Sequence, residues 1–299
     1  MRLSYSPDYY APIPNEHIFP MKKFTALHHY LLEQNLIDSS DIVEPSPVDI
    51  PNLTTVHSQR YSNGIVNGDL GKRELRKLGL PWSKRLAHRS RLAVQGTINA
   101  SLMALQDGIS GNLAGGTHHA MPDYGEGFCV FNDVAVAIKV LRQSMWAKKI
   151  LVIDCDVHQG NGTAKIFKNN DDVFTFSLHG AKNYPFKKPP STLDIGLPDE
   201  TQDEVYLSTL GDALDEIFEQ FSPDLVYYLG GIDPLEADHF GRLSLTMNGL
   251  KNRDRIVIQK VIDDDVPLVL LLSGGYAPTL GDTVRAHALM YETALELAL

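Results

Sequence analysis

A short run of branched apolar residues, Ile150 to Ile153, constrains the fold more than any other feature of the sequence. Such a run is typical of a strand buried on both faces, as strands in a parallel sheet are. Directly after it, Asp154, Asp156 and His158 alternate with single residues in DCDVHQGNG. Side chains two residues apart on an extended backbone point the same way. Because ligands of open α/β sheets bind beyond the carboxyl ends of the strands, we expect Asp156 and His158 to reach a common ion there.

Strand and helix patterns alternate along the rest of the chain. Strands are predicted over 2–5, 112–114, 172–178, 225–229 and 267–272, and helices over 22–36, 72–79, 83–105, 134–145, 203–221, 250–262 and 282–298. This alternation predicts an α/β fold with a mainly parallel sheet and helices on both faces. The segment 38–53, rich in Ser, Asp and Pro, is interpreted as a surface connection. No repeat or linker interrupts the pattern, so one domain over 1–299 is predicted.

The charge balance argues against a general nucleic-acid-binding protein. The chain has a net charge of −10, whereas such proteins present a basic face. One basic cluster in the predicted helix 83–105 is interpreted as solvated or salt-bridged side chains. It consists of Lys84, Arg85, Arg89 and Arg91.

Neither a signal peptide nor a membrane span is recognisable in the sequence. The two cysteines, Cys129 and Cys155, lack a CxxC pattern and are expected to be reduced, buried thiols. We therefore expect a cytoplasmic protein without membrane contacts, and a secreted effector is the alternative left open.

Four predicted strands end in polar side chains that a hydrophobic core would not select. The sequences that follow them are GGTHHA, DCDVHQ, GGIDP and SGGY, which contain His118, His119, Asp156, His158, Asp233 and Tyr276. Taken singly, the DxDxH run could be a hydrogen-bonded turn, Asp233 a turn residue before proline, and the histidines a satisfied core pair. Because the ends of parallel strands lie at one edge of a sheet, the four groups together favour an active site.

Asp156, His158 and Asp233 make a set of three metal ligands. A catalytic zinc ion keeps a further position for water, and Fe²⁺ or Co²⁺ accepts similar ligands. Such an ion would lower the pKa of its water from about 15.7 toward about 7 and polarise a carbonyl group. The histidine pair offers acid–base catalysis, and the Tyr276 hydroxyl can donate to an oxyanion. These parts predict amide hydrolysis by a metal-activated water.

The motifs resemble those of the zinc-dependent histone deacetylase superfamily, closest to class IV and related bacterial histone deacetylase-like amidohydrolases. The resemblance spans nearly the whole chain, through HIFPMKKF, LGLPWS, RSRLAVQGT, GGTHHA, GEGFCVFND, DCDVHQGNGTA, GGIDPLEAD, GRLSLT and SGGYAP. It implies the arginase/deacetylase fold, with about eight mainly parallel strands in a central sheet between helices. It also implies the same three metal ligands that the residues indicate.

By this resemblance, His119 is the general base and acid, His118 is its electrostatic partner, and Tyr276 polarises the scissile carbonyl. Asp154 is available to His118. Many class I relatives carry an aspartate where this chain has Asn161, and a neutral amide stabilises an imidazolium less. Since class IV members share the asparagine, we interpret it as a mark of that class. The SGGYAP loop lacks a third glycine found in many relatives but keeps its tyrosine.

The resemblance further implies a narrow tunnel for an acyl-lysine side chain, lined by Gly127 and Phe128, with Tyr184 as a further wall. Family members also bind potassium, partly through main-chain carbonyls. The corresponding residues here are Asp154, Ser177 and Leu178.

The expected function is removal of acetyl or longer acyl groups from lysine side chains of peptides or proteins, and tolerance of long acyl chains is expected because class IV relatives show it. Hydrolysis of acetylpolyamines or other small acylated amines is the first alternative. A catalytically weak acyl-lysine-binding protein is the second, but it predicts a lost ligand, histidine or Tyr276, and none is missing. A binuclear manganese ureohydrolase would need further ligands where Gln159 and Asn161 stand.

Overall fold

The apolar run at Ile150 forms β4 (Ile150–Asp154), a fully buried strand near the centre of an eight-stranded sheet. The computed structural model describes residues 1–298, and within them every strand pair of this sheet is parallel. The strand order is β2-β1-β3-β8-β7-β4-β5-β6. The other strands are β1 (Leu3–Ser4), β2 (Ile42–Val43), β3 (Ile109–Asn112), β5 (Val173–Gly180), β6 (Leu193–Leu197), β7 (Leu225–Leu229) and β8 (Leu268–Leu271). The predicted parallel α/β sheet is confirmed.

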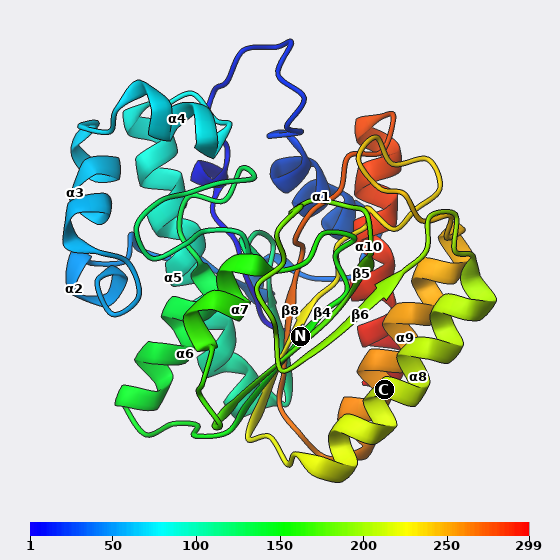
Figure 1. Cartoon of the computed structure of the whole chain (residues 1–299). Helices are drawn as coiled ribbons and strands as arrows, with labels where there is room; N and C mark the ends of the chain where they lie inside the picture. The colour runs from blue at the N-terminus through cyan, green and yellow to red at the C-terminus, as the bar shows by residue number, and fades with distance from the viewer. Residues whose placement is uncertain (299) are drawn as a thin grey trace.

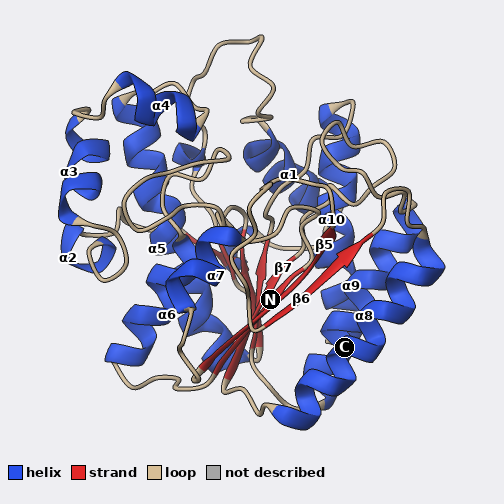
Figure 2. Ribbon diagram, viewed as in Figure 1, coloured by secondary structure: helices blue, strands red, loops and turns tan. Residues whose placement is uncertain are grey.

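Helices cover both faces of the sheet (Figures 1 and 2). On one side α5 packs against α6, β3 and β8. On the other side α8 packs against α9, α9 against α10, and α10 against α1. The longer helices are α1 (Lys23–Glu33), α5 (Lys84–Asp107), α6 (Asp133–Gln143), α8 (Asp203–Gln220), α9 (Met247–Asp263) and α10 (Leu280–Leu297). The shorter ones are α2 (Ile50–Leu53), α3 (Gln59–Asn67), α4 (Lys72–Leu78) and α7 (Asn161–Phe167).

Strand burial explains why the apolar runs are recognisable in the sequence. Each residue of β4, β7 and β8 is buried, because these central strands have helices on both faces. The edge strand β6 instead alternates half-buried and exposed residues before its buried end. Its LDIGL sequence carries only two apolar residues before that end, so the pattern predicts no strand there.

Some element boundaries differ from the prediction. The strand expected over 112–114 is β3, which ends at Asn112, so the following residues belong to the loop. The segment 38–53, expected to be a connection, contains the two-residue strand β2 and the whole of α2. The helices α3 and α7 were not predicted, since Gly64 interrupts the first and Gly162 the second. Of these differences, only that at the end of β3, which precedes the histidine pair, moves a strand end that carries polar residues, by two residues, and His118 and His119 still follow it on the loop.

Within residues 1–298, no helix combines the length and apolar character needed to cross a membrane. A single cluster of buried apolar side chains from the sheet and its helices forms the core.

Candidate metal centre and active site

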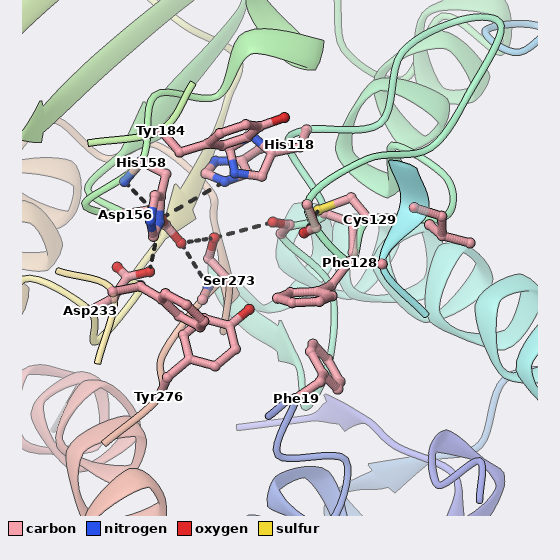
Figure 3. A pocket seen from close by; sticks show the side chains of 18 of the residues that line it. Phe19, His118, Phe128, Cys129, Asp156, His158, Tyr184, Asp233, Ser273 and Tyr276 are labelled. Atoms are coloured by element: carbon pink, nitrogen blue, oxygen red, sulfur yellow. Dashed lines mark hydrogen bonds and ion pairs between the residues drawn. The ribbon is translucent and has the colours of Figure 1, made fainter. Parts of the chain in front are cut away.

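Three ligand-type side chains converge at the carboxyl ends of β4 and β7, which are neighbours in the sheet. Asp156 and His158 follow β4, Asp233 follows β7, and one ligand atom of each lies within 4.8 Å of the others. The Nδ1 atom of His158 is 3.0 Å from Oδ1 of Asp156 and 3.2 Å from Oδ2 of Asp233 (Figure 3). The backbone amide of Val157 donates to Oδ1 of Asp233 at 2.8 Å, which ties the two loops together.

The chemistry of this donor set fits a divalent cation such as zinc, iron or cobalt. Burial, with the neighbouring charge of Asp156, raises the pKa of Asp233 to about 7. Burial lowers the pKa of His158, but its hydrogen bonds to Asp156 and Asp233 outweigh this and raise it to about 10. The raised pKa values of Asp233 and His158 favour protonation of the metal-free cluster, and a cation can replace these protons.

The loop after β8 closes the metal centre from a third side. The Ser273 hydroxyl and the Gly274 amide both donate to Oδ2 of Asp156, each at 2.7 Å. A Cβ atom at Gly274 would lie 2.4 Å from Oδ2 of Asp233, so only glycine fits this approach. Because Ser273 and Gly274 both bind Oδ2 of Asp156, its Oδ1 atom is the oxygen that faces His158.

His118 and His119 lie beside the metal centre on the loop after β3. Nδ1 of His118 is 2.7 Å from Oδ2 of Asp154, and Nδ1 of His119 is 2.7 Å from Oδ1 of Asn161. Burial lowers the pKa of His118, but the Asp154 charge outweighs it and raises this pKa to about 9. Burial, assisted by the charge of His118, holds the pKa of His119 well below its usual value. The pair thus combines a charged imidazolium with a neutral imidazole that can accept a proton.

A cavity of about 400 Å³ opens on the metal centre and on the histidine pair. Its aromatic walls are Phe19, Phe24, Phe128, Tyr184, Phe240 and Tyr276. The ring centroid of Phe128 lies 6.0 Å from that of Tyr276 (Figure 3). The ring centroid of Tyr184 lies 5.1 Å from that of His119. Gly127 also lines the cavity, so all three residues expected in a tunnel border it.

Residues 17–291 match the histone deacetylase domain family. The chain belongs to this family. Histone deacetylase 2 of Arabidopsis thaliana is 29% identical over 87% of this chain and 70% of its own length. The acetoin utilization protein AcuC of Bacillus subtilis is 30% identical over 82% of this chain and 69% of its own. An uncharacterized protein of Picosynechococcus sp. is 42% identical over 98% of both chains.

Among solved structures, an HDAC homolog from Aquifex aeolicus matches with a TM-score of 0.85 and 26% identity. The match covers 98% of this chain and 83% of that one. The expected superfamily and its arginase/deacetylase fold are therefore confirmed.

The residues expected to bind potassium lie on adjacent strands. Asp154 on β4 pairs in register with Ser177 on β5, and Leu178 is the next residue of that strand. The Ser177 hydroxyl is 3.0 Å from Nδ1 of His179, while Asp154 contacts His118. A monovalent cation at this place stays a prediction.

The interpretation of the basic cluster as a solvated face is wrong for one member. Lys84 and Arg85 are exposed, but Arg89 is buried and lines the cavity. Its Nε donates to the carbonyl of Tyr9 at 2.8 Å, and its guanidinium lies 4.5 Å from the Phe24 ring centroid. Arg89 stands three residues after a buried leucine of α5, and this helical spacing could have identified it.

Two further buried charged residues beside the site were missed. Nζ of Lys23 donates to the Ser273 carbonyl at 3.1 Å and lies 3.2 Å from Nε2 of His287. Burial lowers the pKa of Lys23 to about 8. Glu126 contacts Asn161, the partner of a catalytic histidine candidate. Neither Lys23 nor Glu126 follows a strand end, so the pattern that located the ligands could not locate them.

Proposed function

We propose that this member of the histone deacetylase family is a metal-dependent lysine deacylase, with one catalytic domain over 1–299. The observation that carries the proposal is a single arrangement. Asp156, His158 and Asp233 meet beside a neutral His119, and Tyr276 lines the same aromatic cavity. Zinc is the proposed ion, with Fe²⁺ or Co²⁺ as substitutes of similar ligand preference.

A divalent ion bound by these three residues would supply Lewis acidity to a substrate carbonyl and lower the pKa of a water molecule. His119 accepts a proton from water as the water oxygen adds to the amide carbon. The C–N bond then breaks, and His119 returns the proton to the departing amine nitrogen. The second proton of the water stays on the new carboxyl group, so the products are a carboxylic acid and a free lysine amine, and the acid then loses its proton to solvent or to the amine. His118 remains charged through Asp154 and offsets the negative charge that develops nearby.

Tyr276 is proposed to donate a hydrogen bond from its hydroxyl group to the substrate carbonyl oxygen, which becomes negatively charged as water adds to the carbonyl carbon. Burial raises the pKa of Tyr276 well above its usual value, so the hydroxyl keeps its proton at neutral pH. Loss of one such donor typically costs about 10²–10³ in rate.

The cavity walls support an acylated aliphatic amine as substrate. Phe128, Phe19 and Tyr184 offer apolar surface to the methylene groups of a lysine side chain. This side chain carries no charge once its amine is acylated. Phe24 and Arg89 also line the cavity, and the apolar ring of Phe24 supports tolerance of longer acyl chains. Acylated lysine peptides or proteins are therefore the proposed partners, with class IV character, a cytoplasmic location and potassium at Asp154 as further parts of the proposal.

A turnover screen with protein of defined metal content tests this function. Acyl-lysine peptides of graded chain length, acetylpolyamines and small amides are compared with zinc-, iron- and cobalt-loaded protein. His119→Ala and Tyr276→Phe should each lose most activity, whereas His29→Ala, at an exposed position of α1, should not. Turnover of polyamines or small amides alone would replace the lysine proposal. Full activity in both site variants would contradict the assigned roles.

A further inference from the structure

A chain of buried polar contacts leads away from the metal centre behind His119. Oδ1 of Asn161 is 2.7 Å from Nδ1 of His119, and Nδ2 of Asn161 donates to Oε1 of Glu126 at 2.6 Å. The other oxygen of Glu126, Oε2, accepts from Nζ of Lys77 at 3.0 Å. Glu126 is 5% exposed and Asn161 is 3% exposed, so the contacts between Glu126, Asn161 and His119 are shielded from water, whereas Lys77 forms the exposed end of the chain.

We propose that Glu126 is a positioning residue: it fixes the side-chain amide of Asn161 and thereby keeps the proton of His119 on Nδ1 and the lone pair on Nε2. The inference deepens the proposed function, since it rests on His119 as the base. Its structural part, the position of one proton, is independent of which amide is the substrate.

The groups that can donate a hydrogen bond fix the orientation of each side chain in this chain of contacts. A carboxylate only accepts hydrogen bonds, so the NH₂ group of Asn161 must face Glu126. The carbonyl oxygen of Asn161 then faces His119, and a carbonyl oxygen also only accepts. Nδ1 of His119 must therefore carry a proton, which leaves Nε2 free in the neutral ring. A neutral amide without Glu126 behind it could face the ring either way round.

The backbone places Glu126 there through a tight turn. Gly127 and Phe128 both have positive φ, 57° and 65°, and the amide of Cys129 returns to the carbonyl of Glu126 at 2.9 Å. A Cβ atom at Gly127 would lie 2.5 Å from Cδ2 of His119, so glycine is required. The turn therefore places the Phe128 side chain in the cavity wall and the Glu126 carboxylate against the side-chain amide of Asn161.

The same turn is tied to the helix that carries Lys77. The amide of Phe128 donates to the carbonyl of Leu78 at 2.9 Å, at the end of α4. Lys77 therefore meets Glu126 from a fixed direction, and its ammonium lies 3.4 Å from the ring centroid of Tyr124. Because an ammonium only donates, Lys77 requires an acceptor on its side of Glu126, and it would fix the orientation of a glutamine side chain introduced at this position.

This direction makes the effect of Glu126→Gln specific. The introduced glutamine would turn its side-chain oxygen toward Lys77 and its NH₂ group toward Asn161. The amide of Asn161 would then reverse and donate to Nδ1 of His119, moving the ring proton to Nε2. The base would lose its lone pair on the side of the metal centre while the shape of the site is kept.

The test uses zinc-loaded protein with ¹⁵N-labelled histidine, and nitrogen NMR reports which ring nitrogen of His119 carries the proton. The signals are assigned by their loss in His119→Ala. We expect protonated Nδ1 in the wild type and protonated Nε2 in Glu126→Gln. A wild-type protein with the proton on Nε2, or a Glu126→Gln variant that keeps it on Nδ1, overturns the proposal.

A double variant separates positioning from packing. In Asn161→Asp/Glu126→Gln, the new carboxylate accepts both from Nδ1 of His119 and from the NH₂ group of the introduced glutamine. We expect Glu126→Gln to lower kcat by roughly 10- to 100-fold at unchanged KM, and the double variant to regain both kcat and the Nδ1 proton. Glu74→Gln, near the surface of α4, is the matched control and should match the wild type.

A double variant as impaired as Glu126→Gln overturns the proposal. If lysine deacylation itself is absent, the NMR readings still decide the position of the proton. Failure of the function and failure of this inference are therefore distinguishable.

Discussion

Asp133, in the first turn of α6, accepts a hydrogen bond from the backbone amide of Thr117 at 2.7 Å, one residue before the histidine pair. Its carboxylate also accepts from the amide of Gly116 at 3.1 Å and from the hydroxyl of Thr97 at 2.5 Å. The hydroxyl of Thr117 is a further donor to the same group. A single buried carboxylate thus holds the turn that carries both histidines.

Asp133→Asn should destabilise the fold and displace the histidines, because its NH₂ group would face donors where the carboxylate accepts. Loss of buried hydrogen bonds to a charged group predicts a decrease of about 3 kcal/mol in the free energy of unfolding. Urea unfolding measures the stability, and kcat in the folded fraction measures the displacement. Asp212→Asn, exposed on α8, is the control, and equal stability of the two variants would contradict the role of Asp133.

The convergence of the candidate ligands was predictable from sequence for a simple reason. Asp156, His158 and Asp233 directly follow strands whose apolar runs are recognisable, and parallel strands bring their ends together. Strand recognition alone therefore places these side chains at one edge of the sheet.

The residues that orient this site could not be predicted in the same way. Asp133 starts a helix, Glu126 lies in a turn, and Lys23 starts another helix. Each contacts the site only in the folded protein, through residues that are distant in the sequence, and a local sequence pattern cannot identify such contacts. A charged residue in such a place looks like a surface residue until its burial is known.

Metal binding should release protons, because the ligand cluster retains them. A metal ligand must be deprotonated, yet the pKa of His158 is raised to about 10 and that of Asp233 to about 7. We expect about one to two protons to be released per ion near pH 7, and the affinity to fall as the pH is lowered from about 8 to about 6. Calorimetry in buffers of different ionisation enthalpy counts these protons. Binding without proton release would contradict the charge state of the cluster.

Acid should destabilise the metal-free protein partly through His57. This ring donates from Nδ1 to the Met121 carbonyl at 3.0 Å and accepts at Nε2 from the Asn132 amide at 2.9 Å, so it has no place for a second proton. Burial lowers its pKa from 6.5 to about 4. The unfolded chain therefore binds more protons between these values, and stability falls as the pH decreases through them, by about 3 kcal/mol for this group.

Unfolding titrations across this pH range measure the decrease in the free energy of unfolding. The wild type is compared with His57→Gln and with the control His29→Gln, whose histidine is exposed. His57→Gln should be less stable at neutral pH but show a shallower decline with acid. A decline as steep as that of the wild type would assign the acid sensitivity to other groups.

Asp238 should influence catalysis through the position of Tyr276. One carboxylate oxygen of Asp238 accepts from the Tyr276 amide at 2.6 Å, and the other accepts from the amides of Phe240 and Gly241 at 2.8 and 3.0 Å. Asp238→Ala frees the tyrosine loop, and we expect kcat to fall by about 10-fold, against about 10²–10³ for Tyr276→Phe. If Asp238 acts only through the tyrosine hydroxyl, the double variant should be no slower than Tyr276→Phe, since coupled residues are not additive. Rate losses that multiply fully in the double variant would instead show that Asp238 acts on the reaction by another route.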